Sequence, residues 1–148
     1  MPSDRLCRNA AAGIALVLLG MGASCRDGRQ ATYPVSGQVT IGGQPAASAD
    51  LRFYETRGQT PGMSRPYATT DAEGRFDVST YGMHDGAPPG EYRVTVSWKG
   101  PLDGISPDQR DAMPERLPAR YTDPSTSGIQ VHIVRGQNLL ETIDIVLQ

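Results

Sequence analysis

Residues 88–98, PPGEYRVTVSW, decide the fold class of this chain, because polar and apolar residues alternate strictly from Glu91 onward. A period of two residues is the pattern of a β-strand that buries one face. The apolar and aromatic residues share that face: Tyr92, Val94, Val96 and Trp98. The stretch therefore predicts a strand whose inner side packs on a hydrophobic core.

The same alternation recurs on both sides of this strand. It is found in five further stretches: 33–41, 49–55, 74–79, 129–134 and 139–147. A shorter β-prone run covers Tyr67 to Thr70, and Gly- or Pro-rich turns lie between the runs. A helical stripe is not found after the N-terminal segment. Pro107 and Pro114 are expected to interrupt any helix within 106–117, which should hold at most one or two turns. The pattern predicts an all-β sandwich of about seven antiparallel strands.

The N-terminal segment has a different character. Arg5 and Arg8 precede an uncharged apolar run of 15 residues, AAAGIALVLLGMGAS, at positions 10–24. A charged region, an apolar region and small residues in this order are typical of a secretory signal peptide. A bilayer-spanning helix needs about 20 apolar residues, so we expect residues 1–24 to be a signal peptide that is removed.

Cys25 follows this run directly, in the sequence Gly22-Ala23-Ser24-Cys25. It resembles a bacterial lipobox, in which the chain is cut before a cysteine that carries lipid, although Gly22 stands where Leu or a similar residue is usual. Cys7 would leave with the signal peptide, so the mature chain could form no internal disulfide. The alternative is ordinary cleavage that leaves a free thiol. We expect lipid attachment at Cys25 and a polar tether over residues 25–32.

The bulk composition limits the remaining possibilities. The chain has 148 residues, which suits one domain, expected over residues 33–148. A net charge of −2 gives no basic surface for nucleic acid. We expect a protein held at a membrane of the cell envelope by its N-terminal lipid, on the periplasmic or the surface face.

Two clusters of ionisable residues are candidates for chemistry. Asp71-Ala72-Glu73-Gly74 could hold a cation, but two acids followed by a glycine and a strand are typical of a turn, and we expect a β-hairpin turn here. His84 and Asp85 are adjacent in a Gly/Pro-flanked loop without a second histidine or cysteine at metal-ligand spacing. His132 falls at an outward strand position. We expect no catalytic residues, no metal and no cofactor.

Several of these stretches together resemble the carboxypeptidase regulatory-like domain. They are the hairpin sequence TDAEGRFDV at 70–78, the strand PPGEYRVTV at 88–96 and the opening VSGQV at 35–39. With the lipobox and the segment RYTDPSTSG at 120–128, the layout is similar to small lipoproteins of planctomycete-type bacteria. The resemblance implies a transthyretin-like, or immunoglobulin-like, β-sandwich with a folding, binding or spacer role and defines no functional residues.

Three functional hypotheses follow, and one of them is a structural subunit in which an edge strand pairs between copies of the chain. In the first, an exported lipoprotein carries a non-catalytic binding or structural module, which contacts an envelope protein or a glycan through loops 81–90 and 99–128. Exposed tyrosines suit such contacts, and three lie in loops or outside the inward positions: Tyr54, Tyr81 and Tyr121. Tyr121 could instead pack the long loop down over the sandwich, together with the prolines of that loop. In the second, a small envelope hydrolase or metal-dependent enzyme uses His84, Asp85 and the loop 99–128.

Overall fold

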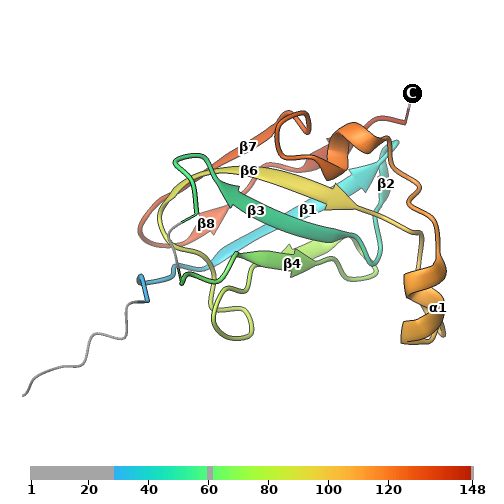
Figure 1. The fold of residues 1–148 in the computed structure, drawn as a ribbon, viewed down its shortest axis with the longest axis horizontal. Helices are drawn as coiled ribbons and strands as arrows, with labels where there is room; N and C mark the ends of the chain where they lie inside the picture. The colour runs from blue at the N-terminus through green and yellow to red at the C-terminus, as the bar shows by residue number, and fades with distance from the viewer. Residues whose placement is uncertain (1–28, 60–61, 148) are drawn as a thin grey trace, which may run out of the picture.

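The computed structural model describes residues 29–59 and 62–147, which form two facing β-sheets with little helix (Figure 1). The expected all-β sandwich is confirmed. The predicted signal peptide over 1–24 and the lipid-bearing Cys25 lie outside the described residues. Within the described part, none of the helices has the length and apolar character needed to cross a membrane.

The four-stranded sheet contains the strand that decided the fold class. Its antiparallel order is β4 (Tyr67–Thr69), β3 (Asp50–Glu55), β6 (Gly90–Ser97) and β7 (Ile129–Ile133). The inward residues predicted for β6 are buried, except Trp98, which is partly buried just beyond the strand and packs against the core. The indole Nε1–H of Trp98 donates a hydrogen bond of 2.9 Å to the carbonyl of Ala47.

The five-stranded sheet is built around the first strand of the domain. Its members are β1 (Val35–Ile41), β2 (Gln44–Pro45), β5 (Arg75–Asp77), β8 (Asn138–Leu139) and β9 (Ile143–Ile145). Ser36 pairs with both Asp77 and Leu139, so β5 and β8 occupy opposite edges of β1. In the same way, Thr40 pairs with residues of both β2 and β9. β1 is therefore the central strand.

Two strand directions differ from the antiparallel expectation, because β8 and β9 run parallel to β1. The chain crosses between the sheets in the turn from Val134 to Asn138. The Asn138 side chain closes this turn: its Oδ1 accepts from the Val134 N–H, and its Nδ2 donates to the carbonyls of Val134 and Gly136. The backbone N–H of Asn138 donates to the carbonyl of Pro34, which attaches the returning chain to the start of β1.

The turn at residues 71–74 is confirmed, but the hairpin expected around it is wrong. Asp71 Oδ1 accepts from the backbone N–H groups of Glu73, at 3.0 Å, and Arg75, at 2.8 Å. The strands on either side separate, β4 into one sheet and β5 into the other, and a single bridge between Tyr67 and Ser79 joins the two arms. The turn thus carries the chain from one layer of the sandwich to the other.

Three aromatic rings connect the layers inside the core. The ring centroid of Phe53, on β3, lies 6.5 Å from that of Phe76, on β5, and 6.3 Å from that of Tyr92, on β6. The Phe53–Tyr92 pair is edge-to-face, an arrangement worth about 0.5–1.5 kcal/mol beyond the buried area. All three rings are buried, which confirms the inward position predicted for Tyr92.

The long loop, residues 99–128, holds two short helices: α1 (Pro107–Ala112) and the 3₁₀ helix η1 (Ala119–Thr122). Pro107 begins α1 instead of interrupting it, because the N–H that proline lacks has no helical partner at this position. Of the two roles expected for Tyr121, the structure shows packing: the residue is only 8% exposed and packs on the core with Leu117. The loop is therefore folded onto the sandwich.

Gly74 provides a test of the crossing turn. Its φ is +74°, and a Cβ at this position would lie 2.4 Å from the carbonyl oxygen of Val39. Gly74→Ala should lower the free energy of unfolding by roughly 2–4 kcal/mol, the sum of left-handed strain and overpacking. Gly104→Ala is the control, since its φ is +71° and no atom lies within 4 Å of a built Cβ. Equal losses in urea unfolding would contradict the close-packing argument.

Candidate functional site

The loop that contains His84 and Asp85 is organised by the Asp85 carboxylate. Asp85 Oδ1 accepts from the N–H of Thr80 at 2.7 Å, and Oδ2 accepts from the N–H groups of Tyr81 and Gly82, each at 3.0 Å. Burial raises the pKa of Asp85, but these backbone hydrogen bonds outweigh it and leave the pKa below its ordinary value. The carboxylate is thus used to close its own loop.

The His84 side chain is not part of the hydrogen bonds around Asp85. The residue is exposed, its φ is +55°, and its backbone N–H donates to Ser79 Oγ at 2.8 Å. A general base needs a partner that orients the imidazole, and the neighbouring carboxylate of Asp85 is directed to backbone N–H groups instead. The two candidates are therefore adjacent in sequence without forming an acid–base pair.

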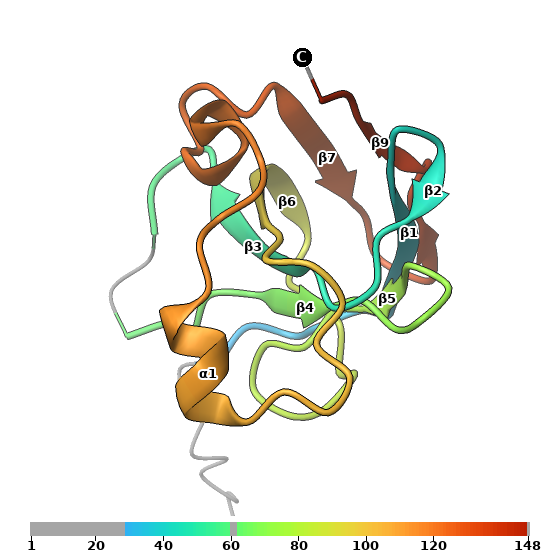
Figure 2. The same ribbon diagram turned by 90° about the vertical axis from the view of Figure 1, so that its right-hand side faces the viewer.

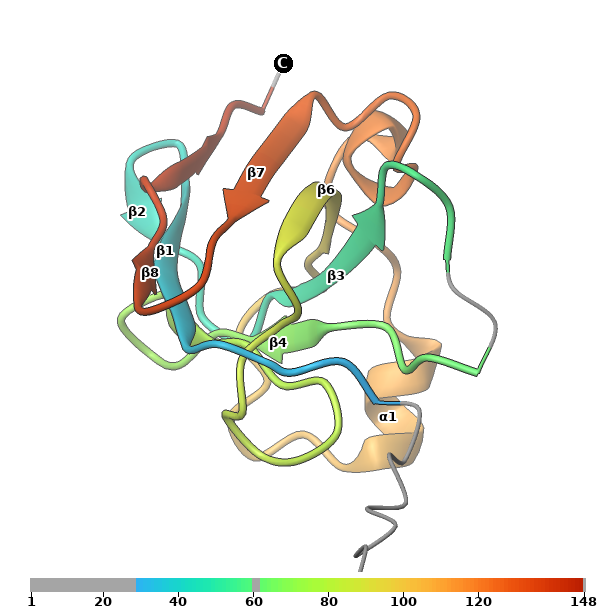
Figure 3. The same cartoon turned by 90° about the vertical axis from the view of Figure 1, so that its left-hand side faces the viewer.

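The two loops proposed to share a contact surface lie apart. Residues 81–89 lie toward the end of the long axis where the described chain begins, whereas α1 of the long loop lies toward the other end (Figures 1 and 3). The structure does not bring these two candidate regions together.

A second carboxylate, which the sequence analysis did not single out, attaches the long loop to β6. Glu115 Oε1 accepts from the backbone N–H groups of Trp98, Arg116 and Leu117 at 2.9–3.0 Å, and Oε2 accepts from Ser97 Oγ at 2.5 Å. Partial burial raises the pKa of Glu115, but the hydrogen bonds outweigh it and leave the pKa below 4.5. Glu115 has no local sequence signal, because its partners come from two separate segments.

Each candidate tyrosine has an arginine beside its ring. The guanidinium carbon lies 4.3 Å from the ring centroid for Arg65 on Tyr54, 5.5 Å for Arg29 on Tyr81 and 4.7 Å for Arg120 on Tyr121. A guanidinium over an aromatic face gains a cation–π attraction of about 0.5–1 kcal/mol at exposed sites. One face of each ring is therefore engaged within the chain.

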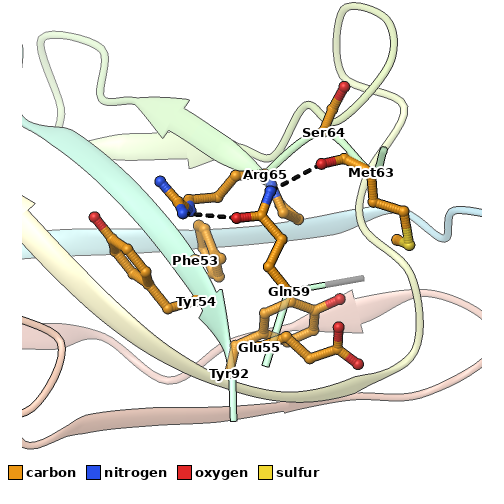
Figure 4. Close-up of a pocket in the computed structure, with 9 residues that line it drawn as sticks. Phe53, Tyr54, Glu55, Gln59, Met63, Ser64, Arg65 and Tyr92 are labelled. Atoms are coloured by element: carbon orange, nitrogen blue, oxygen red, sulfur yellow. Dashed lines mark hydrogen bonds between the residues drawn. The ribbon is translucent and has the colours of Figure 1, made fainter. Parts of the chain in front are cut away.

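A small cavity lies beneath the Arg65 side chain, at the end of β3 (Figure 4). Its volume is about 60 Å³, and Arg65 Nη2 donates to Gln59 Oε1 at 2.8 Å beside it. Ligand pockets usually measure roughly 300–1,000 Å³, so this space suits a few water molecules. In its wall, the Tyr92 hydroxyl donates to the carbonyl of Pro88, and burial, with the charge of Glu55 added, raises the Tyr92 pKa to about 12. The phenol thus stays neutral.

A larger groove opens between the edges of the two sheets. Its volume is about 430 Å³, and its walls are Ile129–Val131 of β7 and residues 139–144 of the other sheet. β7 and β9 lie side by side across it in the end-on view (Figure 2). Leu139, on the rim, is 81% exposed. We call this feature the β7 groove.

The exposed hydrophobic residues gather in the same part of the chain. Four of the six large ones among the described residues follow β7: Val134, Leu139, Val146 and Leu147. They do not form one patch, because Leu139 pairs with Ser36 at the start of β1, whereas Val146 follows Ile145, which pairs with Ile41 at its end. His132 lies on the outer face of β7 as predicted, with a side chain 64% exposed and Nδ1 3.7 Å from Glu91 Oε1.

The described part of the chain has no cluster of side chains suited to a metal ion. Over residues 29–59 and 62–147, no three side chains of His, Cys, Asp or Glu gather closely enough to hold an ion. Asp71 and Glu73, the first candidates, share a turn in which the Asp71 carboxylate accepts two backbone N–H groups. The Asp71 carboxylate is thus used to close its own turn.

Asp85 and His84 can be separated by substitution. Asp85→Ala removes the acceptor of three backbone hydrogen bonds, so we expect a loss of about 1–3 kcal/mol in the free energy of unfolding. His84→Asn should change it by less than about 0.5 kcal/mol, because asparagine tolerates the left-handed backbone. Urea unfolding measures both. A larger effect of the histidine change would refute the structural role assigned to Asp85.

The depressed pKa of Glu115 predicts an acid-sensitive loop. The folded chain binds this proton more weakly than the unfolded chain, so the stabilisation is complete above about pH 4.5 and is lost as the pH falls through the folded-state pKa. Trp98, the single tryptophan, should report the release as a fluorescence change. Glu115→Gln should abolish this transition, and Asp123→Asn, in a turn closed by Ser125, should leave it intact. An unchanged transition in Glu115→Gln would contradict the assignment.

Comparisons with known proteins leave the family open. No family model matches the chain, and no curated protein matches it significantly. Among solved structures, a 9R-lipoxygenase from Cyanothece PCC8801 aligns with 78% of this chain at 15% sequence identity and a TM-score of 0.36. The chain covers 16% of the length of that enzyme, and a likeness at this level carries no conclusion about function.

Proposed function

We propose that this protein is an exported lipoprotein, anchored through Cys25, whose β-sandwich is a non-catalytic binding or structural module at the cell envelope. The assignment of a non-catalytic role rests on the hydrogen-bond partners of the carboxylates whose pKa values are shifted. Asp85, Glu115 and Asp123 each accept backbone N–H groups that close a turn or fasten a loop. Shifted pKa values often mark functional sites, but here the partners are structural.

The position of the N-terminal segment supports the anchoring part. Tyr33 pairs with Ala87 through two backbone hydrogen bonds of 2.9 and 3.0 Å, which fix the chain where it enters the sandwich. A lipid at Cys25, eight residues before Tyr33, would hold this end close to a bilayer. The opposite end, with α1, would then face away from the membrane (Figure 1). An envelope protein or a glycan would be met there or along the sides.

The alternative, a small envelope hydrolase or metal-dependent enzyme, would need another arrangement of the loop that contains His84 and Asp85. It needs the Asp85 carboxylate to orient the His84 imidazole or to ligate an ion. Three backbone N–H groups already occupy that carboxylate. The helix α1 of the long loop, the third part of that alternative, lies toward the other end of the molecule (Figure 1).

The anchor is tested by lipid labelling of the full-length chain in a bacterial host with lipoprotein processing. The parent protein should incorporate an alkyne analogue of palmitate and enter the detergent phase, with an intact mass that starts at a modified Cys25. Cys25→Ser should lose the label and move to the aqueous phase. Cys7→Ser, a matched change inside the signal peptide, should keep both properties.

A further variant keeps this test decisive. Gly22→Leu restores the aliphatic residue usual in a lipobox and should be labelled at least as well as the parent. If neither the parent nor Gly22→Leu takes up label, the anchoring part of the proposal is wrong. The sandwich would then be a free exported domain, to be searched for soluble ligands.

A further inference from the structure

β7 is the long open edge of the four-stranded sheet. The opposite edge strand of that sheet is β4. Its residue Tyr67 exchanges two backbone hydrogen bonds with Ser79, at 2.9 and 2.8 Å, so that edge is partly closed. β7 has five residues, and β6 is its one partner strand within the described part of the chain. Proteins usually protect such an edge with a charge, a proline or a bulge. Ile129–Ile133, IQVHI, contains no proline and no Lys, Arg, Asp or Glu.

The sequence of β7 is symmetric in side-chain type about Val131. Isoleucine stands at both ends, Ile129 and Ile133, and polar residues stand at the second and fourth positions, Gln130 and His132. An antiparallel strand with the same sequence would place isoleucine opposite isoleucine and valine opposite valine. We propose that β7 pairs with β7 of a second copy of this chain, about a two-fold axis at Val131.

The charges on the neighbouring strand fit this pairing. Glu91 of β6 lies opposite His132, and Arg93 lies opposite Gln130. Across the two-fold axis, the row on the outer face would therefore read Glu91, His132, the partner's Gln130 and the partner's Arg93. Each row joins an acidic end to a basic end, and no like charges stand directly opposite one another across the junction. An isologous interface repeats this arrangement twice.

The pairing also accounts for the apolar surface of the β7 groove. Ile129 and Val131 are half-buried where β7 lines the groove, and Leu139 on its rim is exposed. A second β7 at the free edge would place the partner's Val131 beside Val131 and remove water from these side chains. Removing apolar area from water contributes roughly 25 cal/mol per Å², in addition to the backbone hydrogen bonds of the new ladder. This inference does not depend on the lipid anchor.

Charge substitution on the outer face of β7 tests the inference by sedimentation velocity of the full chain. The parent should dimerise in a concentration-dependent way. The double variant Gln130→Lys with His132→Lys would put lysine opposite lysine at two symmetry-related places and should weaken the dimer roughly tenfold or more. The matched control, Gln130→Glu with His132→Lys, puts opposite charges together and should dimerise at least as well as the parent. Circular dichroism checks that both variants fold.

A crosslink tests the position of the axis. Cα atoms of directly opposed antiparallel residues are roughly 4.5–5.5 Å apart, within the range of a disulfide. Val131→Cys should form a covalent dimer under mild oxidation, above the background that the parent gives through Cys7 and Cys25. A parent that stays monomeric, a double-lysine variant that dimerises like the parent, or a Val131→Cys chain without extra crosslinking would each overturn the proposal. A monomeric parent would leave the edge to an extended strand of another protein.

Discussion

The structure depends on the hydrogen bonding of β1 along both of its edges. β5 and β2 pair on one edge, and β8 and β9 on the other, so the first strand of the domain is held by segments from the middle and the end of the chain. Gly37 lies in this strand beside Phe76, where a Cβ would approach the ring to 2.6 Å. The ring can therefore pack flat on β1 and reach Phe53 in the opposite sheet. The partners β8 and β9 come from the end of the chain. Pairing between residues so far apart in sequence forms slowly during folding, so the hydrogen bonding of β1 is completed only when these last strands return.

Carboxylates organise the connections that this arrangement requires. Asp71 closes the turn that carries the chain between the layers, Asp85 closes the loop before β6, and Glu115 fastens the long loop to the end of β6. Each does so by accepting backbone N–H groups that would otherwise lack partners in irregular structure. The loops fastened by Asp85 and Glu115, whose pKa values are lowered, should therefore respond to acid before the sheets do.

Sequence patterns predicted the parts of the fold that rest on local periodicity. The alternation in 91–98 gave β6 and its buried face, and Asp71 with Gly74 gave a turn at the right place. Strand partners were not predictable, because alternation in 139–147 says nothing about which strand lies alongside or in which direction. The fastening by Glu115 was missed for a related reason, since it depends on residues distant in sequence. His132 was placed correctly by its register, whereas lipid attachment at Cys25 stays a prediction.

The entry of the chain into β1 has a mechanical consequence. Residues 29–34 lead directly into the strand that pairs on both edges, after the Tyr33–Ala87 bridge. Inter-strand hydrogen bonds lie across the strand direction, so a pull on the N-terminal segment along β1 loads the bonds to several strands at once, in shear. Strands loaded in shear resist force together, whereas strands that are unzipped yield one bond at a time. A module tethered through this segment would bear tension between a bilayer and a bound partner without unravelling from its first strand.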